Sequence, residues 1–236
     1  MSTPADTALP VWKMIYLAQR NPQLRAEDFP QAWREHSALG RQCKNVGQRV
    51  KAVAQCARLL HHAAPALSSH YDGVNLMVLA DREAGQAIWE DPETLSIMRP
   101  DEPRVFADYV RNFSMLCSQH VLHSTAEALT PPKNGQVLLI GFLQRSPAWP
   151  GPAAAPQTCP PAWRAASLAQ AQRVVCNTVQ DMPPAGYGFA HIVEWWFDTE
   201  AAALQAARDL QQWPTHGPEG CGDSVFMLTT VTHSRP

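Results

Sequence analysis

The chain has 236 residues and a mass of 26.1 kDa, enough for one large domain or two small ones that each bury a core. Hydrophobic residues make up 45% of the sequence and charged residues 17%, which excludes an intrinsically disordered chain. A formal net charge of -2 gives no electrostatic footprint for nucleic acid, and no apolar run approaches the roughly 20 residues of a membrane-spanning helix. The first residues lack the basic and apolar regions of a signal peptide, so we expect a cytoplasmic protein.

The first half of the sequence predicts strands and helices in the order β-α-β-β-α-β, which is that of a ferredoxin-like unit. The first helix opens at Asp28-Phe29-Pro30, because a first helical turn tolerates proline. Asp81 is the expected N-cap of the second helix. The apolar run 50–60 is expected to be a strand, although its periodicity also fits a helix. The expected strands are 12–18, 50–60, 71–79 and 113–122, and the expected helices are 28–42 and 81–89.

The second half repeats this order in a weaker form. Arg173-Val174-Val175-Cys176 echoes the strand around Cys56, and Pro161-Ala162-Trp163-Arg164 echoes Gln31-Ala32-Trp33-Arg34. Echoes that keep their order while their offset drifts indicate two copies of one unit separated by insertions and deletions. The resulting divisions are a flexible N-terminus at 1–10, a first repeat at 11–123, a linker at 124–134 and a degenerate second repeat at 135–236.

Two copies in one chain have a structural consequence. A single ferredoxin-like unit covers one face of its sheet with helices and leaves the other face bare, so that face must be buried elsewhere. The strand 71–79 is apolar on both faces, with Val74 and Leu76 on one and Met77 and Leu79 on the other. We therefore expect an α+β protein whose two repeats pack sheet to sheet as an intramolecular barrel, with a further homodimer as an additional possibility.

Four segments of the first half form a recognisable set. They are Gln19-Arg20-Asn21-Pro22, then Phe29 with Trp33-Arg34-Glu35-His36, Tyr71-Asp72-Gly73-Val74, and Asp101-Glu102-Pro103-Arg104-Val105-Phe106-Ala107-Asp108. This set resembles the EthD family of dimeric α+β-barrel proteins, and the last segment is its most specific part. One spacing differs, because family members place the helix histidine four residues after the tryptophan and His36 comes three after Trp33.

The resemblance implies a ligand cavity between the sheet and its helices. EthD proteins occur in bacterial catabolic clusters, fungal relatives resemble tailoring enzymes for aromatic polyketides, and the wider superfamily includes cofactor-free monooxygenases and isomerases. We expect a hydrophobic cyclic or aromatic ligand and a cofactor-independent enzyme of the isomerase, dehydratase or monooxygenase type. The alternatives are a non-catalytic ligand-binding or accessory protein and a structural adaptor whose cavities are filled by side chains.

Three candidates could carry the chemistry. His36 on the first helix is a candidate general base, with a solvent-facing histidine beside Glu35 as the alternative. Tyr71 and Asp72 could orient a ligand at a barrel mouth, or shape the turn into their strand. Glu194 lies in an apolar strand, where desolvation would raise its pKa and suit it to acid–base catalysis; an ion pair with an arginine is the alternative.

Other polar residues are candidates for ligand binding. Asn75 and His191 occupy corresponding positions among apolar neighbours, and leaving such a group buried and unpaired costs about 1–3 kcal/mol. They must therefore be hydrogen-bonded or face a cavity. Gln55 and Asn177 could bind a ligand carbonyl, or only the backbone.

Trp33 and Trp195 are candidate walls of an aromatic pocket, with core packing as the alternative. His120 and His123 diverge on a strand and predict no metal site. The six cysteines show no zinc-site spacing, and nothing indicates a secreted protein, so we expect them to be reduced. No motif for a nucleotide, a flavin or a nucleophilic serine is present, so the expected set of cofactors and metals is empty.

Overall fold

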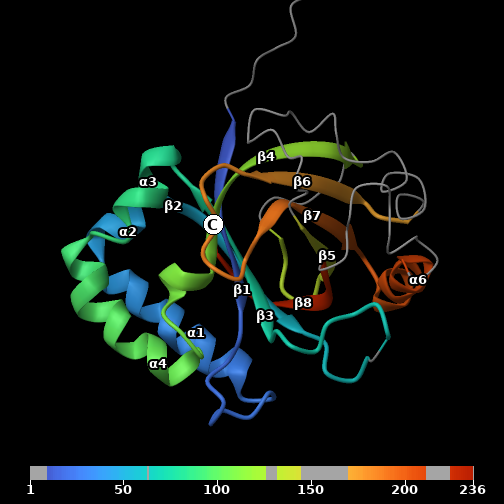
Figure 1. The fold of residues 1–236 in the computed structure, drawn as a ribbon, viewed down its shortest axis with the longest axis horizontal. Helices are drawn as coiled ribbons and strands as arrows, with labels where there is room; N and C mark the ends of the chain where they lie inside the picture. The colour runs from blue at the N-terminus through green and yellow to red at the C-terminus, as the bar shows by residue number, and fades with distance from the viewer. Residues whose placement is uncertain (1–9, 63, 126–131, 145–169, 211–223, 236) are drawn as a thin grey trace, which may run out of the picture.

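Eight antiparallel strands close into one barrel in the computed structural model, which describes residues 10–62, 64–125, 132–144, 170–210 and 224–235. Around the barrel the strands follow the order β1-β3-β2-β8-β5-β7-β6-β4 (Figure 1). The strands are β1 Val11–Ala18, β2 Val50–Arg58, β3 Gly73–Leu79, β4 Ser114–Ser124, β5 Val137–Gln144, β6 Arg173–Val179, β7 Phe189–Phe197 and β8 Val225–Arg235.

The two halves of the chain contribute four strands each, in the same order. The first half runs β4-β1-β3-β2 and the second runs β8-β5-β7-β6. Pairing of β2 with β8 and of β4 with β6 joins the halves. The fold is therefore α+β, as predicted, and each expected strand is present within a few residues of its expected bounds. The run 50–60, which fitted a strand or a helix, is a strand as far as Arg58.

The helices gather in two places. The first-half helices α1 to α4 lie on one side of the barrel, and α6 lies at the opposite end (Figure 1). Asp81 caps α3 as predicted, since its Oδ1 accepts a hydrogen bond from the Ala84 backbone N–H at 2.8 Å. The helices are α1 Phe29–Leu39, α2 Lys44–Arg49, α3 Arg82–Ala87, α4 Glu102–Val105 and α6 Glu200–Leu210.

Several short helical segments were not predicted. The expected first helix ends at Leu39 and continues to Gln42 only as the 3-10 segment η1, and α2 follows it. The segment from 94 to 105 breaks into a π-helix, a 3-10 turn and α4. Pro100 and Pro103 cannot donate backbone hydrogen bonds there, so one continuous helix cannot form.

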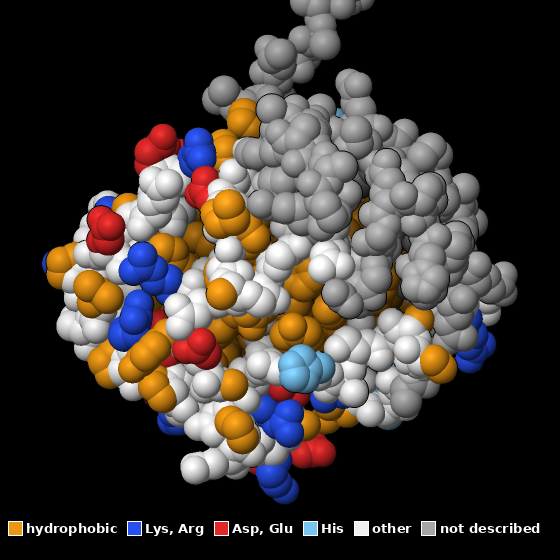
Figure 2. All heavy atoms as spheres, viewed as in Figure 1, with side chains coloured by type: hydrophobic (Ala, Val, Ile, Leu, Met, Phe, Trp, Pro, Cys, Tyr) orange, Lys and Arg blue, Asp and Glu red, His pale blue; other side chains and the backbone are white. Residues whose placement is uncertain are grey.

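Apolar side chains on the strands are buried on both faces of the barrel wall. Because successive side chains alternate, Ile15 and Leu17 of β1 point into the barrel while Met14 and Tyr16 pack under the first-half helices. A third cluster, which includes Trp195 and Ala203, lies between the second half of the barrel and α6. On the face shown in Figure 2, charged side chains gather over the helices and along the lower edge, while apolar ones lie towards the centre.

Some predictions fall outside the described residues. The echo at 161–164 is one of them, and so are Cys159 and Cys221. The other four cysteines, Cys43, Cys56, Cys117 and Cys176, are buried thiols that form no disulfide. In the described part of the chain, no helix is long and apolar enough to cross a membrane.

Candidate functional site

A row of polar side chains crosses the outer face of the first-half sheet. In the strand register Tyr16 lies opposite Asn75, and Asn75 lies opposite Gln55. Residues paired in register share a face of the sheet, so these three side chains stand in one line across β1, β3 and β2. His233 of β8 continues the line, because it is paired with Gln55.

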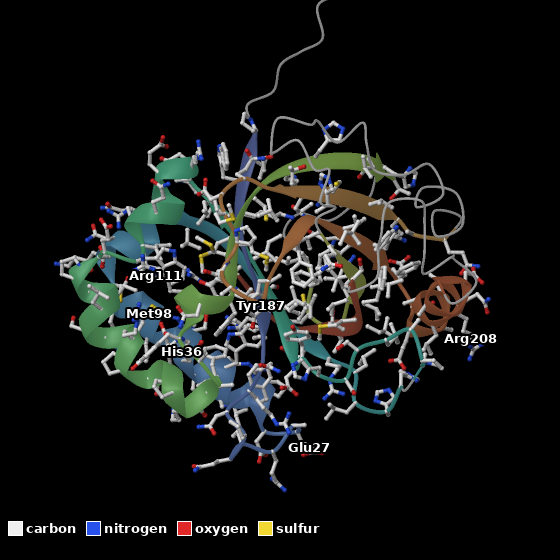
Figure 3. The ribbon with its side chains drawn as sticks, in the orientation of Figure 1. Glu27, His36, Met98, Arg111, Tyr187 and Arg208 are labelled. Carbon is white, nitrogen blue, oxygen red and sulfur yellow. The ribbon has the colours of Figure 1, made fainter. Side chains whose placement is uncertain are left out.

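A cavity of about 60 Å³ lies between this row and the helices. In Figure 3 the labelled His36 and Met98 lie close together, His36 from α1 and Met98 from the segment before α4. Both residues line the cavity. Its remaining wall is mainly aromatic and aliphatic, and includes Trp33, Val46, Met77, Ile88, Trp89, Phe106 and Val110.

Three oxygens of the lining have no hydrogen-bond partner among the described residues. They are Oε1 of Gln55, Oδ1 of Asn75 and Oγ1 of Thr94. An unpaired polar atom in a buried place costs about 1–3 kcal/mol. Gln55 is held on its other side, where its Nε2 donates to the Trp33 carbonyl at 3.4 Å. Polar atoms left open around one cavity are what a bound ligand or ordered water would satisfy.

His36 lines the cavity and is linked to Asp101, which in turn is held by Arg104. Its side chain is buried, so the solvent-facing alternative is wrong, and its Nδ1 lies 3.0 Å from Oδ2 of Asp101. Arg104 donates to both oxygens of Asp101, at 2.7 and 3.0 Å. Burial lowers the pKa of His36, and the carboxylate of Asp101 only partly restores it. Burial raises the pKa of Asp101, but the hydrogen bonds of Arg104 and His36 outweigh it and keep that pKa below its ordinary value.

Tyr16 and Glu102 add two acidic groups that favour their protonated forms. Burial raises the pKa of Tyr16, and the nearby charge of Glu102 raises it further. Burial also raises the pKa of Glu102, although its Oε2 accepts a hydrogen bond from the Val110 N–H at 2.9 Å. The cavity thus combines a neutral imidazole with groups able to donate protons or hydrogen bonds.

The structure brings four predicted site residues together here, namely His36, Trp33, Gln55 and Asn75. Asp72 lies outside the cavity and connects the end of β1 to the start of β3. It accepts hydrogen bonds from the Arg20 backbone N–H and guanidinium at 2.9 and 2.8 Å. Tyr71 is next to it, with its ring against His70 and Tyr187. Neither Asp72 nor Tyr71 lines the cavity.

Glu194 is inside the barrel and away from the cavity. Its Oε1 lies 2.6 Å from Nζ of Lys13 and accepts a hydrogen bond from Asn177 at 2.7 Å, while Oε2 accepts one from Trp196 at 2.9 Å. Burial raises the pKa of Glu194, but Lys13 and these hydrogen bonds lower it more. The predicted raised pKa is therefore wrong, and the partner is a lysine where an arginine was considered. Asn177 serves the same ion pair and cannot reach a ligand in the cavity.

His191 and Trp195 lie on the outer face of the second half. The Nδ1 of His191 is 3.4 Å from Oγ1 of Thr178, and burial lowers the pKa of this histidine. Trp195 is fully buried in the cluster beneath α6, so core packing accounts for it. Both residues are far in the barrel order from the strands that floor the cavity.

Five lining or positioning residues were missed by the sequence reasoning. Asp101, Glu102 and Arg104 belong to the segment that carries the family resemblance, but their pattern gave no role to each side chain. Tyr16 and Thr94 carry no motif, and only the strand register and the π-helix before α4 place them at the cavity.

One group of described residues has ligand atoms close enough to hold a metal ion. Donor atoms of His61, His62 and Glu200 lie within 4.8 Å of one another, at the surface and away from the cavity. Hydrogen bonds from both imidazoles to Oε1 of Glu200 account for this arrangement without an ion. His120 and His123 are exposed on β4 and belong to no such group among the described residues.

Known proteins with a similar sequence or structure have the same type of fold. Residues 21–109 match the family model of the EthD domain, while no curated protein matches the chain. A solved anthrone oxidase-like protein aligns with a TM-score of 0.59 and 13% identity, over 97% of this chain and 94% of that one. An arginine-to-alanine variant of chlorite dismutase from Candidatus Nitrospira defluvii aligns with a TM-score of 0.50 and 11% identity, over 93% and 91%. Such low identities show the fold alone, and the family match is a similarity of residues 21–109 of this α+β barrel to the EthD domain.

Proposed function

We propose that the EthD domain binds a small, largely apolar cyclic ligand in this cavity and moves a proton on it, with His36 as the general base. The observation that carries the proposal is the chain of contacts from Arg104 through Asp101 to His36, at the edge of an aromatic cavity with unpaired polar oxygens. A histidine oriented by a carboxylate and kept neutral by burial is suited to accept a proton near neutral pH.

The roles of the side chains follow from their hydrogen bonds. With its Nδ1–H donated to Asp101, His36 keeps the lone pair of Nε2, and Nε2 has no partner among the described residues. Nε2 takes a proton from an acidic C–H of the ligand, which becomes an enolate. The negative charge on the enolate oxygen is stabilised by hydrogen-bond donors of the polar row, first the Tyr16 hydroxyl and then the Asn75 amide.

The size of the cavity limits the ligand. A dry cavity of about 150 Å³ is enough to bind benzene, so about 60 Å³ accepts a ring only if the wall adjusts. Met77 and Met98 can make this adjustment, because unbranched thioether side chains change rotamer readily. We therefore favour ligands of one to three rings that displace these two side chains.

Proton exchange on a cyclic ketone tests the proposal. We choose 2-tetralone and anthrone as probes, since both carry an acidic C–H beside an aromatic ring, and the related fold is that of an anthrone oxidase-like protein. Deuterium incorporation from D₂O is followed by NMR with the wild type, with His36→Gln, and with His70→Gln as the control. His70 is an exposed histidine outside the cavity.

We expect exchange above background with the wild type and the control. In His36→Gln the exchange rate should fall by a factor of about 10² or more. An unchanged rate in His36→Gln would remove His36 as the base. Binding of a probe without any exchange would favour the alternative function, a non-catalytic binding protein. That alternative is supported by the unpaired oxygens of Gln55, Asn75 and Thr94, which a ligand satisfies whether or not it reacts.

The second half has a supporting role in this proposal. We read residues 135–236 as a degenerate copy of residues 11–123, because both halves have the same strand order. The second half contributes half of the barrel interior, and through β8 one edge of the cavity.

A further inference from the structure

One cation lines the cavity without a counter-ion among the residues that the structure describes. Arg235 lies near the end of β8, where it pairs with Val53 of β2 and lines the cavity opposite α1. Its side chain is partly buried. Within the described residues it forms no salt bridge, although many other arginines in the same part of the chain do, such as Arg104, Arg20 and Arg49.

Further positive groups surround Arg235. Arg41 follows α1, Arg34 lies on α1, and His233 shares the outer face of β8. Neither Arg34 nor Arg41 forms a salt bridge among the described residues, and Arg34 instead donates to the Thr232 carbonyl at 3.0 Å. Burial lowers the pKa of His233, and the charges of these arginines lower it further. Burial and the charge of Arg41 likewise lower the pKa of Arg235.

The acidic groups at and beside the cavity, Glu102 and Asp101, already have other partners. Asp101 is held by Arg104 and His36, and Glu102 accepts from the Val110 N–H and lies 3.8 Å from Arg99. Among the described residues, no carboxylate forms a salt bridge with Arg34, Arg41 or Arg235. Holding like charges together at a partly buried position is unfavourable, and such an arrangement is typical of a site that receives an opposite charge.

We propose that the ligand of this cavity is an anion, whose acidic group binds the guanidinium of Arg235 while its ring lies against the aromatic wall. The inference rests on the proposed function, because it concerns the same cavity. A carboxylate is the group we favour, since arginine presents two parallel N–H donors that match its two oxygens. Arg41 and Arg34 reinforce the attraction from outside the cavity.

Two matched pairs of probes test the inference. Benzoate and benzamide, and 2-naphthoate and 2-naphthamide, have nearly the same shape within each pair and differ in charge. Their dissociation constants are measured by calorimetry and by quenching of tryptophan fluorescence, since Trp33 and Trp89 line the cavity. We expect each anion to bind at least tenfold more tightly than its amide, and Arg235→Gln to remove that advantage while leaving amide affinity unchanged.

Two further variants make the test specific. Arg235→Lys should keep part of the preference, because it retains the charge and loses the paired geometry. Arg82→Gln is the control and should change nothing, since Arg82 pairs with Asp181 outside the cavity. Equal affinity for anion and amide in the wild type, or a preference that survives in Arg235→Gln, would overturn the inference and leave the proposed proton transfer standing. Binding of neither pair would overturn the cavity as a ligand site, and this inference with it.

Discussion

The chemistry of His36 is set by two opposing influences on one side chain. Burial favours the neutral imidazole, while the neighbouring Asp101 carboxylate favours the charged form, and burial is the stronger. The result is a histidine whose pKa lies below its ordinary value, so that the neutral imidazole is favoured. Arg104 keeps Asp101 ionised next to the ring.

Removing the charge of Asp101 should lower the pKa of His36 further. In Asp101→Asn the partner that raises this pKa is neutral, whereas the burial of the ring is unchanged. An NMR titration of the His36 ring protons should therefore give a midpoint below 6.5 in the wild type and a still lower one in the variant. A higher midpoint in the variant would show that Asp101 does not stabilise the imidazolium.

Protein stability should fall as the pH drops below about 6.5, the ordinary pKa of histidine. Above that pH His36 is neutral in the folded and in the unfolded chain. Below it the unfolded chain binds the proton first, because the pKa in the folded state is lowered, and the free energy of unfolding decreases until the folded pKa is reached. Urea unfolding at pH 7 and pH 5 should show a smaller loss in His36→Gln. An equal loss would mean that His191 and His233, whose pKa values are also lowered, carry the whole effect.

At the scale of elements, the cavity depends on how closely α1 lies on the sheet. The first residue of β3 is Gly73, and a Cβ added there would lie 2.5 Å from Cζ3 of Trp33 and 3.0 Å from the Cys56 carbonyl oxygen. Only glycine lets the indole of Trp33 approach the strand this closely. That approach puts Trp33 and His36, three residues apart on α1, over the polar row.

Gly73→Ala should therefore destabilise the protein by about 1–3 kcal/mol, since the helix must move away from the sheet. Gly47→Ala is the matched control. A Cβ at Gly47 in α2 meets nothing within 4 Å, and the substitution should stabilise the fold by about 0.4–1 kcal/mol. Urea unfolding measures both values, and a Gly73→Ala variant as stable as the wild type would contradict the close contact.

At the scale of the whole molecule, one ion pair links the two halves across the barrel interior. Lys13 comes from β1 and Glu194 from β7, and their relative exposures are 5% and 1%. A buried pair of this kind contributes little net stability compared with apolar residues, but removal of one partner leaves an uncompensated charge. The pair therefore favours the one alignment of the halves in which both charges meet.

Lys13→Met should cost about 3–5 kcal/mol, because the buried carboxylate of Glu194 then lacks its cation. Glu194→Gln should also be destabilising, while the double variant should lose clearly less than the two single losses combined. Urea unfolding of the four proteins gives the coupling energy, and strict additivity would argue against the pair. Benzoate affinity should be the same in Glu194→Gln and the wild type, as expected of a residue outside the cavity.

Much of the architecture could be predicted from the sequence. Periodicity and local signals such as Asp81 located the strands and the longer helices, because these depend on neighbouring residues. The segment 101–108 indicated the family, and the candidate residues drawn from the sequence included His36, Trp33, Gln55 and Asn75.

Only the tertiary structure decided which of those residues act together. The register of β1 with β3 brings Tyr16 beside Asn75, and the closure of the barrel brings Arg235 to the cavity and Lys13 to Glu194. Each of these contacts joins residues far apart in the chain. The pKa of Glu194 is lowered and not raised as predicted, because Lys13 lies beside its carboxylate. A sequence determines periodicity and local conformation directly, whereas a pairing across a closed barrel joins segments far apart in the chain, so its partners are known only once the barrel has closed.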